Sequence, residues 1–169
     1  LRSFVQDKLI DYPPAISKAL SADVNRTINA EQLVPDFVRD VLEDRQRREP
    51  LFLGFAERPD WIKEATGVDT QGYAVLLPAD APRHVQGSHG FDGKGQRAAL
   101  PDDFAKVEEV LNDPDALRAG DSSRQGNPTV VATKTIDGET FRAVWEVLSG
   151  KRNRSLQLTS LVIKTGARK

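Results

Sequence analysis

The chain has 169 residues, of which 38% are hydrophobic and 29% are charged, a balance typical of one globular domain of ordinary size. It contains no cysteine, which excludes a disulfide framework, a thiolate metal site and a cysteine nucleophile. Its longest apolar runs, such as Tyr73–Leu77, are far shorter than the roughly 20 residues that span a bilayer, so we expect no membrane partner. The chain starts at Leu1 with neither Met nor a signal peptide, and we expect it to be part of a longer protein.

The net charge of −1 hides an uneven distribution along the chain. Residues 1–50 carry 8 basic and 9 acidic side chains, residues 51–127 carry 8 and 13, and residues 128–169 carry 8 and 3. The three segments therefore have net charges of −1, −5 and +5. A basic C-terminal third favours a surface that faces a polyanion, and the alternative is a solvated basic terminus without a function.

The first fifty residues are predicted to be helical. Helical spacing of apolar residues occurs in Ala15–Ile28 and in Glu31–Arg48, and the second segment has a stripe that includes Val34, Val38 and Val41. Nothing in this part suggests catalysis. We interpret residues 1–50 as a helical extension or linker from a longer parent protein, and residues 51–169 as the functional domain.

Short strands and one short helix are predicted next. Leu51–Phe55 and Tyr73–Leu77 are strand candidates, and between them a helix begins near Pro59 and ends at Gly67. The segment from Pro78 to Gly95 is rich in Gly, Pro and Asp, which predicts a long loop. Loops of this length are usually functional or mobile.

The remainder predicts one helix and then a β-meander. Asp102–Leu111 has helical spacing, Asn112–Asp115 ends the helix, and Gly120–Asn127 is a polar loop. Asp137-Gly138 lies between the β-rich runs Pro128–Thr135 and Thr140–Leu148, which is a strong hairpin signal, and Ser155–Lys164 is a third strand. The order predicts an α+β fold in which N-terminal helices pack beside a small antiparallel sheet that ends in a three-stranded meander.

Several residue types in this frame could carry chemistry. Both histidines, His84 and His89, lie in the predicted loop, and an imidazole can accept and donate a proton at neutral pH. Alternation in Thr140–Leu148 puts Phe141, Ala143, Trp145 and Val147 on one face and Arg142, Val144 and Glu146 on the other. Thr159 and Ser160 interrupt an apolar strand, where hydroxyls either bond across strands or bind phosphate oxygens.

Four short motifs occur together between Tyr73 and Lys164: His89 after a strand, the Leu100–Phe104 segment leading to Val110–Asp115, the Asp-Gly hairpin, and Leu156–Leu161. In combination they resemble the phage-associated branch of the barnase–EndoU–colicin–RelE nuclease superfamily. Such domains sit at the C-termini of phage head proteins and of polymorphic toxins. The acidic balance of residues 51–127 departs from that of a strongly basic toxin.

The resemblance implies metal-independent cleavage of RNA without a cofactor. It implies that His89 is the catalytic loop histidine, that Lys134 or Arg142 is the basic strand residue, and that Thr159 or Ser160 is the hydroxyl of the last strand. The 2′-hydroxyl of RNA would be the nucleophile, and the products would be a 2′,3′-cyclic phosphate and a 5′-hydroxyl. The expected phosphate-binding residues are His84, Lys151, Arg152 and Arg154.

The resemblance also implies partners and a setting. RNA, with tRNA as one candidate, would be the substrate, and an immunity protein would protect the producing cell. The parent polypeptide would be a phage protein or a toxin. We expect a virion-associated chain, or a secreted or delivered effector that acts in the cytoplasm of a target cell.

Three alternatives remain open at this point. One is a non-catalytic phage virion or assembly domain with the same fold, since a second acid–base group is hard to identify. Another is an ADP-ribosyltransferase, for which Thr159-Ser160 is a poor match and the required downstream acid is missing. A DNA-binding module is conceivable from the basic tail, but no helix-turn-helix pattern with basic recognition residues is found.

Overall fold

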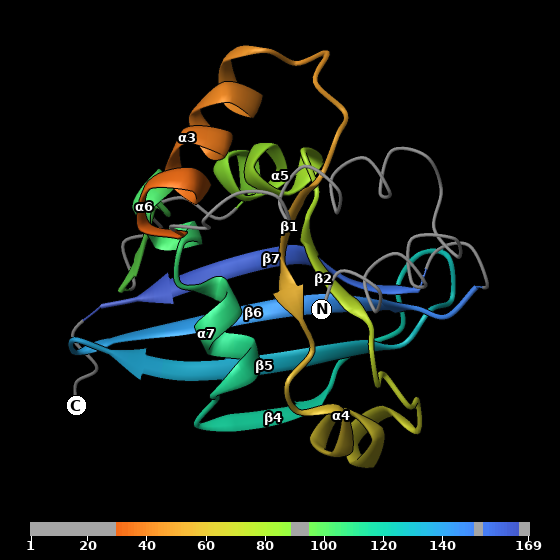
Figure 1. Cartoon of the computed structure of the whole chain (residues 1–169). Helices are drawn as coiled ribbons and strands as arrows, with labels where there is room; N and C mark the ends of the chain where they lie inside the picture. The colour runs from red at the N-terminus through yellow and green to blue at the C-terminus, as the bar shows by residue number, and fades with distance from the viewer. Residues whose placement is uncertain (1–29, 89–94, 151–153, 166–169) are drawn as a thin grey trace.

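The structure is a computed structural model that describes residues 30–88, 95–150 and 154–165 (Figure 1). It has an α+β fold, as predicted, with helices arranged around one twisted sheet. The helix expected over Ala15–Ile28 lies outside the described residues, and so do His89, Lys151 and Arg152. Within the described part, no helix is both long enough and apolar enough to cross a bilayer.

The described elements alternate along the chain. The helices are α3 (Ala30–Glu43), α4 (Pro59–Thr66), α5 (Asp80–Ser88), α6 (Pro101–Phe104) and α7 (Val107–Asn112). The strands are β1 (Leu51–Phe55), β2 (Ala74–Leu77), β3 (Gln96–Arg97), β4 (Ala116–Ala119), β5 (Thr129–Ile136), β6 (Glu139–Leu148) and β7 (Ser155–Lys164).

The sheet is larger than the sequence indicated, and it is mixed. Its strand order is β1-β2-β7-β6-β5-β4, and β3 pairs with the C-terminal end of β7. Neighbouring strands are antiparallel except β2 and β7, which pair in parallel from Ala74↔Ser155 to Leu76↔Gln157. This parallel pairing brings the first half of the domain against the meander, and therefore sets where α5 lies.

The predicted meander β5–β6–β7 is confirmed. Asp137 and Gly138 join β5 to β6 with φ values of 51° and 81°, both in the left-handed region that a two-residue hairpin turn of type I′ requires. Glycine adopts this conformation without strain and Asp tolerates it, so the turn fixes the register of the hairpin.

The larger of two hydrophobic clusters in the described residues lies between the helices and one face of the sheet, and the smaller contains Phe52, Ala74 and Leu76. Trp145 and Phe141 are the largest fully buried side chains of the larger cluster. The predicted stripe of α3, with Val34, Val38 and Val41, packs into this same core. The helix ends at Glu43, before the charged run that was expected to continue it to residue 48.

Several element predictions are wrong. The segment predicted as a loop from residue 78 to 95 contains α5. Ala81 and Val85 are buried on one face of this helix, and Pro82 lies in its first turn, where proline is tolerated. The single helix expected at Asp102–Leu111 is two short helices separated by residues 105 and 106. Strands β3 and β4 were not predicted, whereas α4 does end at Gly67, in the left-handed conformation with φ 81°.

Candidate functional site

The β5–β7 meander has one buried and one polar face. Phe141, Ala143, Trp145 and Val147 are buried in the core, and the alternation predicted for this strand is confirmed. Arg142 on the same strand is exposed on the opposite side. The opposite side carries Arg142 and other polar side chains together with Val131, Val144 and Val162.

Strand pairing aligns these polar side chains across the sheet. Register pairs Arg142 with Val162, Val144 with Ser160, and Glu146 with Gln157. Ser160 is thus a diagonal neighbour of Arg142, a separation that a long side chain can bridge. Arg118 of β4 shares this side, since it pairs with Val131, which pairs with Val144. We call this surface the polar face; its members are Arg118, Arg142, Glu146, Gln157, Thr159 and Ser160.

Thr159 lies at an irregularity of β7. The register shifts between Val144 and Trp145, which pair with Ser160 and Leu158, so Thr159 is the extra residue of a bulge. Its Oγ1 donates a hydrogen bond to the Val144 carbonyl, 3.1 Å away. Thr159 lines a pocket together with residues of α5, and bulges often re-aim a side chain next to an active site.

A pocket of about 240 Å³ lies where α5 meets the polar face. Its lining includes His84 of α5, Glu146 of β6, and Gln157 and Thr159 of β7. We call it the histidine pocket. Its volume is below the roughly 300–1,000 Å³ of pockets that enclose a whole small ligand. It can accommodate one part of a polymer whose remainder lies along the open polar face.

Hydrogen bonds orient the side chains that line the histidine pocket. Asn127 Nδ2 donates to Glu146 Oε2 at 2.9 Å, and Gln157 Nε2 donates to Ser155 Oγ at 3.0 Å. Both bonds are partly buried. They reduce the number of conformations that Glu146 and Gln157 can adopt, which is a condition for a preorganised site.

Arg83 holds the helix that carries His84. Its Nε donates to the Val41 carbonyl at 2.8 Å, and its Nη2 donates to the Asp44 carbonyl at 2.7 Å. Its Nη1 bonds Asp80, one turn earlier in α5, at 2.9 Å. Because Arg83 ties α5 to the end of α3, the neighbouring His84 has a fixed position at the margin of the polar face.

The two candidates for the basic strand residue point to opposite sides of the sheet. Lys134 pairs with Phe141 and so lies on the core side, where its Nζ donates to the carbonyl and Oδ2 of Asp113 at 2.8 and 3.1 Å. The hydrogen bond to Asp113 raises the pKa of Lys134. Arg142 lies with Ser160 on the polar face.

The structure brings together only some of the residues that the sequence singled out. His84 and Thr159 line one pocket, and Ser160 and Arg142 lie on the adjoining surface. Arg154 is partly buried and immediately precedes β7. Sequence reasoning gave no role to Glu146, Gln157 and Arg118. Glu146 could have been found from strand alternation, but Arg118 lies on a strand without a sequence signal.

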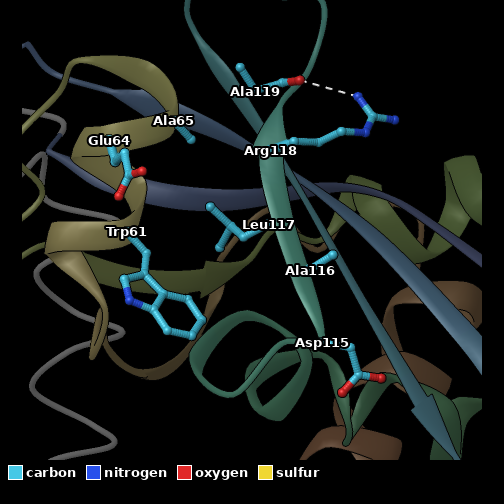
Figure 2. Close-up of a pocket in the computed structure, with 8 residues that line it drawn as sticks. All are labelled: Trp61, Glu64, Ala65, Asp115, Ala116, Leu117, Arg118 and Ala119. Carbon is cyan, nitrogen blue, oxygen red and sulfur yellow. Dashed lines mark hydrogen bonds between the residues drawn. The ribbon is translucent and has the colours of Figure 1, made fainter.

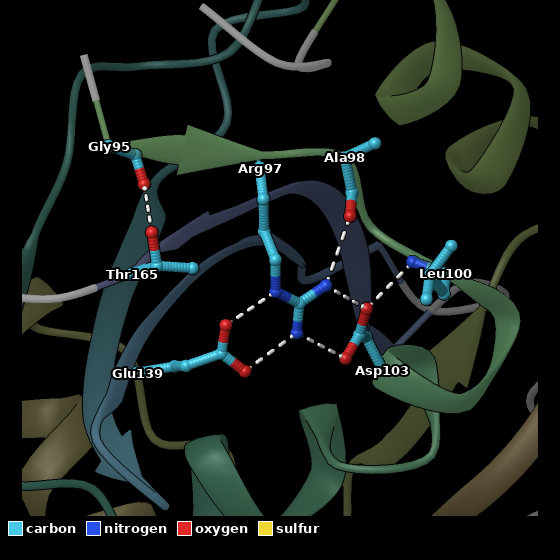
Figure 3. Close-up of polar contacts among 7 residues, drawn as sticks. All are labelled: Gly95, Arg97, Ala98, Leu100, Asp103, Glu139 and Thr165. Carbon is cyan, nitrogen blue, oxygen red and sulfur yellow. Dashed lines mark hydrogen bonds and ion pairs between the residues drawn. The ribbon is translucent and has the colours of Figure 1, made fainter. Parts of the chain in front are cut away.

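Three charged side chains outside the histidine pocket form hydrogen bonds with one another (Figure 3). The Arg97 guanidinium bonds both carboxylate oxygens of Asp103, at 2.7 and 2.8 Å, and both of Glu139, through Nε and Nη2. The Leu100 N–H also donates to Asp103, at 2.7 Å. We call Arg97, Asp103 and Glu139 the Arg97 cluster. It joins β3, α6 and the start of β6.

The pKa values in the Arg97 cluster reflect this pairing. Burial raises the pKa of Asp103, but the hydrogen bonds from Arg97 and Leu100 outweigh burial, and the pKa lies below its ordinary value. The hydrogen bond from Arg97 lowers the pKa of Glu139. Hydrogen bonds to Asp103 and Glu139 raise the pKa of Arg97. All three groups are therefore held in their charged forms.

No group of three or more His, Asp or Glu side chains in the described ranges is arranged to hold a metal ion. The histidine pocket instead combines an imidazole, a carboxylate, an amide and a hydroxyl beside exposed arginines. This set can exchange protons and bind an anion.

A comparison with known protein families matches residues 56–169, more than half of the chain, to the phage-Barnase-EndoU-ColicinE5/D-RelE like nuclease 3 family. The chain belongs to this family. The matched range contains the whole histidine pocket and the polar face. Neither a curated protein nor a solved structure matches the chain.

Proposed function

We propose that the chain is an endoribonuclease whose active site is the histidine pocket together with the polar face. The observation that carries this proposal is that His84 and Glu146, from distant parts of the chain, line one pocket. Membership of a nuclease family supports the reaction class. Arg142 and Arg118 on the same side of the sheet add positive charge where a phosphate backbone would lie.

The chemistry follows from the substrate. RNA contains its own nucleophile, the 2′-hydroxyl, so the protein must transfer protons and stabilise charge. The Glu146 carboxylate accepts the proton of the 2′-hydroxyl while that oxygen attacks phosphorus. The His84 imidazolium donates a proton to the departing 5′-oxygen. The P–O5′ bond breaks as the P–O2′ bond forms, and the products are a 2′,3′-cyclic phosphate and a 5′-hydroxyl.

Arg142 and the two hydroxyls act on the phosphoryl oxygens. Arg142 stabilises the negative charge that accumulates in the transition state, because its guanidinium carries several N–H donors on the side that faces substrate. Ser160, beside it on β7, donates to a non-bridging oxygen. Thr159 shapes the pocket wall through its bulge, and Arg154 holds a flanking phosphate.

The test measures cleavage of total tRNA and ribosomal RNA by the purified chain in EDTA. We expect cleavage that survives chelation and leaves cyclic phosphate ends. His84→Ala and Glu146→Gln should each slow it by about 10²–10⁴-fold, the usual weight of a general acid or base. Gln86→Ala, an exposed position on the same helix, is the matched control and should cleave at the wild-type rate.

Other outcomes separate the alternatives. Loss of cleavage in His89→Ala but not in His84→Ala would move the catalytic histidine out of the histidine pocket. Cleavage lost on chelation would contradict the mechanism. An inactive wild-type chain would favour the non-catalytic phage virion or assembly domain.

We further propose that this activity serves a toxin or a phage-delivered effector that acts on RNA in the target cytoplasm, with an immunity protein in the producing cell. The supporting observation is the phage association of the family. Expression of the chain in a bacterial cytoplasm should arrest growth, and His84→Ala should relieve the arrest.

A further inference from the structure

A groove of about 450 Å³ lies between helix α4 and strand β4, on a different part of the molecule from the histidine pocket (Figure 2). One wall is α4, with Trp61, Glu64 and Ala65, and the other is the whole of β4 with the preceding Asp115. The Trp61 and Leu117 side chains project into the space between the walls (Figure 2).

Strand β4 is the last strand of the sheet on this side. It pairs with β5, and no other described strand pairs with its outer edge. The Gly120 N–H donates to the Thr129 carbonyl at 3.0 Å, in the register that pairs Ala119 with Val130. Because backbone groups alternate in direction along an antiparallel strand, those of Leu117 and Ala119 point to the outer edge. This edge has the donors and acceptors that an added strand requires.

The groove also has an aromatic anchor. Trp61 is 40% exposed, and Arg58 lies over its ring at 4.8 Å from the centroid. Tryptophan is enriched among the residues that contribute most to binding at protein interfaces. The contact with Arg58 shows that this ring accepts a cation over its face.

The charged residues that line the groove indicate which kind of ligand it can bind. Glu64 and Asp115 line it together with Arg118, so the lining has two carboxylates and one guanidinium. Lysine or arginine side chains would be attracted to the two carboxylates.

We propose that the groove between α4 and β4 binds an extended, basic peptide segment of another protein, which adds a strand to the outer edge of β4. The peptide backbone bonds Leu117 and Ala119. Its alternate side chains enter the groove, where apolar ones contact Leu117 and basic ones contact Glu64 and the ring of Trp61. In the free chain Arg118 Nη1 bonds the Ala119 carbonyl at 3.2 Å, an exposed contact that the incoming strand replaces.

The probe is a fluorescent eight-residue peptide of alternating lysine and valine, and its counterpart has glutamate in place of lysine. Fluorescence anisotropy with the full chain should detect binding of the first peptide and not of the second. On binding, the Leu117 and Ala119 amides should become protected from hydrogen exchange.

Two pairs of variants test the geometry and the charge. Ala119→Pro removes an edge N–H without removing a bond to β5, and should weaken binding by about fivefold or more, the weight of one backbone hydrogen bond. Ala119→Thr keeps the N–H and should bind as the wild type does. Glu64→Gln should weaken binding by about twofold to fivefold, whereas Glu43→Gln, an exposed carboxylate of α3, should not.

Four outcomes would overturn the proposal: no binding of the lysine peptide, equal binding of the glutamate peptide, equal effects of Ala119→Pro and Ala119→Thr, or protection of amides elsewhere alone. Thermal unfolding of each variant shows whether it is folded. A binding failure with RNA cleavage intact would leave the proposed function standing.

Discussion

The Arg97 cluster and the histidine pocket both bring together ionisable side chains from separate segments, but their surroundings differ. In the Arg97 cluster, the guanidinium bonds all four oxygens of Asp103 and Glu139, so the three groups satisfy one another (Figure 3). In the histidine pocket, His84 and Glu146 line a cavity of about 240 Å³. The guanidinium of the cluster is occupied by its own carboxylates, whereas the pocket leaves space beside its polar groups.

Charged side chains therefore have two different roles in this domain. A charge network whose members satisfy one another contributes to conformational specificity. A polar set around a cavity leaves room for a reacting group. Substitutions in the Arg97 cluster should therefore change stability, and substitutions on the polar face should change catalysis.

The largest stability effect is expected for Arg97→Met. This change leaves the carboxylate of Asp103, only 5% exposed, without its guanidinium. Breaking a buried pair typically costs 3–5 kcal/mol, and we expect about 3 kcal/mol because the Leu100 N–H still bonds Asp103. Denaturant unfolding measures the loss. Cleavage of RNA per folded molecule should not change.

Arg39→Met is the matched control for Arg97→Met. Arg39 pairs with Asp36 and Asp102 at the surface, at 3.1 and 3.8 Å, so its loss should cost less than about 1 kcal/mol. Acid should also distinguish the two. Asp103 and Glu139 have lowered pKa values, so the stability they contribute is present above their unfolded pKa, near 4, and is lost as pH falls through the folded values. The penalty of Arg97→Met should shrink below about pH 4; a constant penalty would contradict this origin.

The next largest effect concerns catalysis and compares Arg142 with Lys134. Arg142→Met removes a guanidinium from the polar face and should slow RNA cleavage by about tenfold to a hundredfold, less than a fully enclosed donor because Arg142 is exposed. Lys134→Met alters a side chain that bonds Asp113 on the other side of the sheet, so its rate should change by less than about twofold. Initial rates on one RNA substrate measure both. A larger effect of Lys134→Met would place the phosphate on the opposite side.

Local signals predicted the meander, and non-local pairing produced the rest. Asp137-Gly138 and the alternation of β6 depend on neighbours in sequence, so the hairpin and the exposure of Arg142 could be predicted. The two-residue β3 and the alanine-rich β4 have little intrinsic β propensity and are strands because β7 and β5 pair with them. Helix α5 was not predicted because its sequence contains Pro82. The helix is stabilised by packing on α3 and β7 rather than by helix propensity.

The histidine pocket could not be predicted from local sequence signals, because it also depends on non-local strand pairing. His84 and Glu146 line one pocket only because β2 pairs in parallel with β7, which sets α5 against the polar face. No residue spacing within one element predicts that arrangement. The sequence thus indicated a histidine, a basic residue and a hydroxyl as residue types, whereas the parallel pair decides which of them share a cavity.

The smallest effect on stability is expected for a substitution of Glu108. Burial and the nearby negative charge of Glu57 raise its pKa, while a hydrogen bond from the neutral amide of Asn112, at 3.2 Å, lowers it only in part. A raised folded pKa means that Glu108 favours the folded state at low pH and that this contribution is lost as pH rises through the folded value. Glu108→Gln should therefore stabilise the protein at neutral pH, on the order of 0.5 kcal/mol.

Denaturant unfolding of Glu108→Gln at pH 7 and near pH 4 tests this origin. The gain should disappear at the lower pH, where the wild-type carboxyl is protonated and resembles the amide. Glu109→Gln, at the exposed neighbouring position, is the control and should change stability less at neutral pH. A gain that persists in acid would show that packing against Gly54 matters more than charge, since a Cβ added to that glycine would lie 3.3 Å from Glu108 Oε2. Glu108 would then belong with the side chains that fill space rather than with those whose ionisation the fold controls.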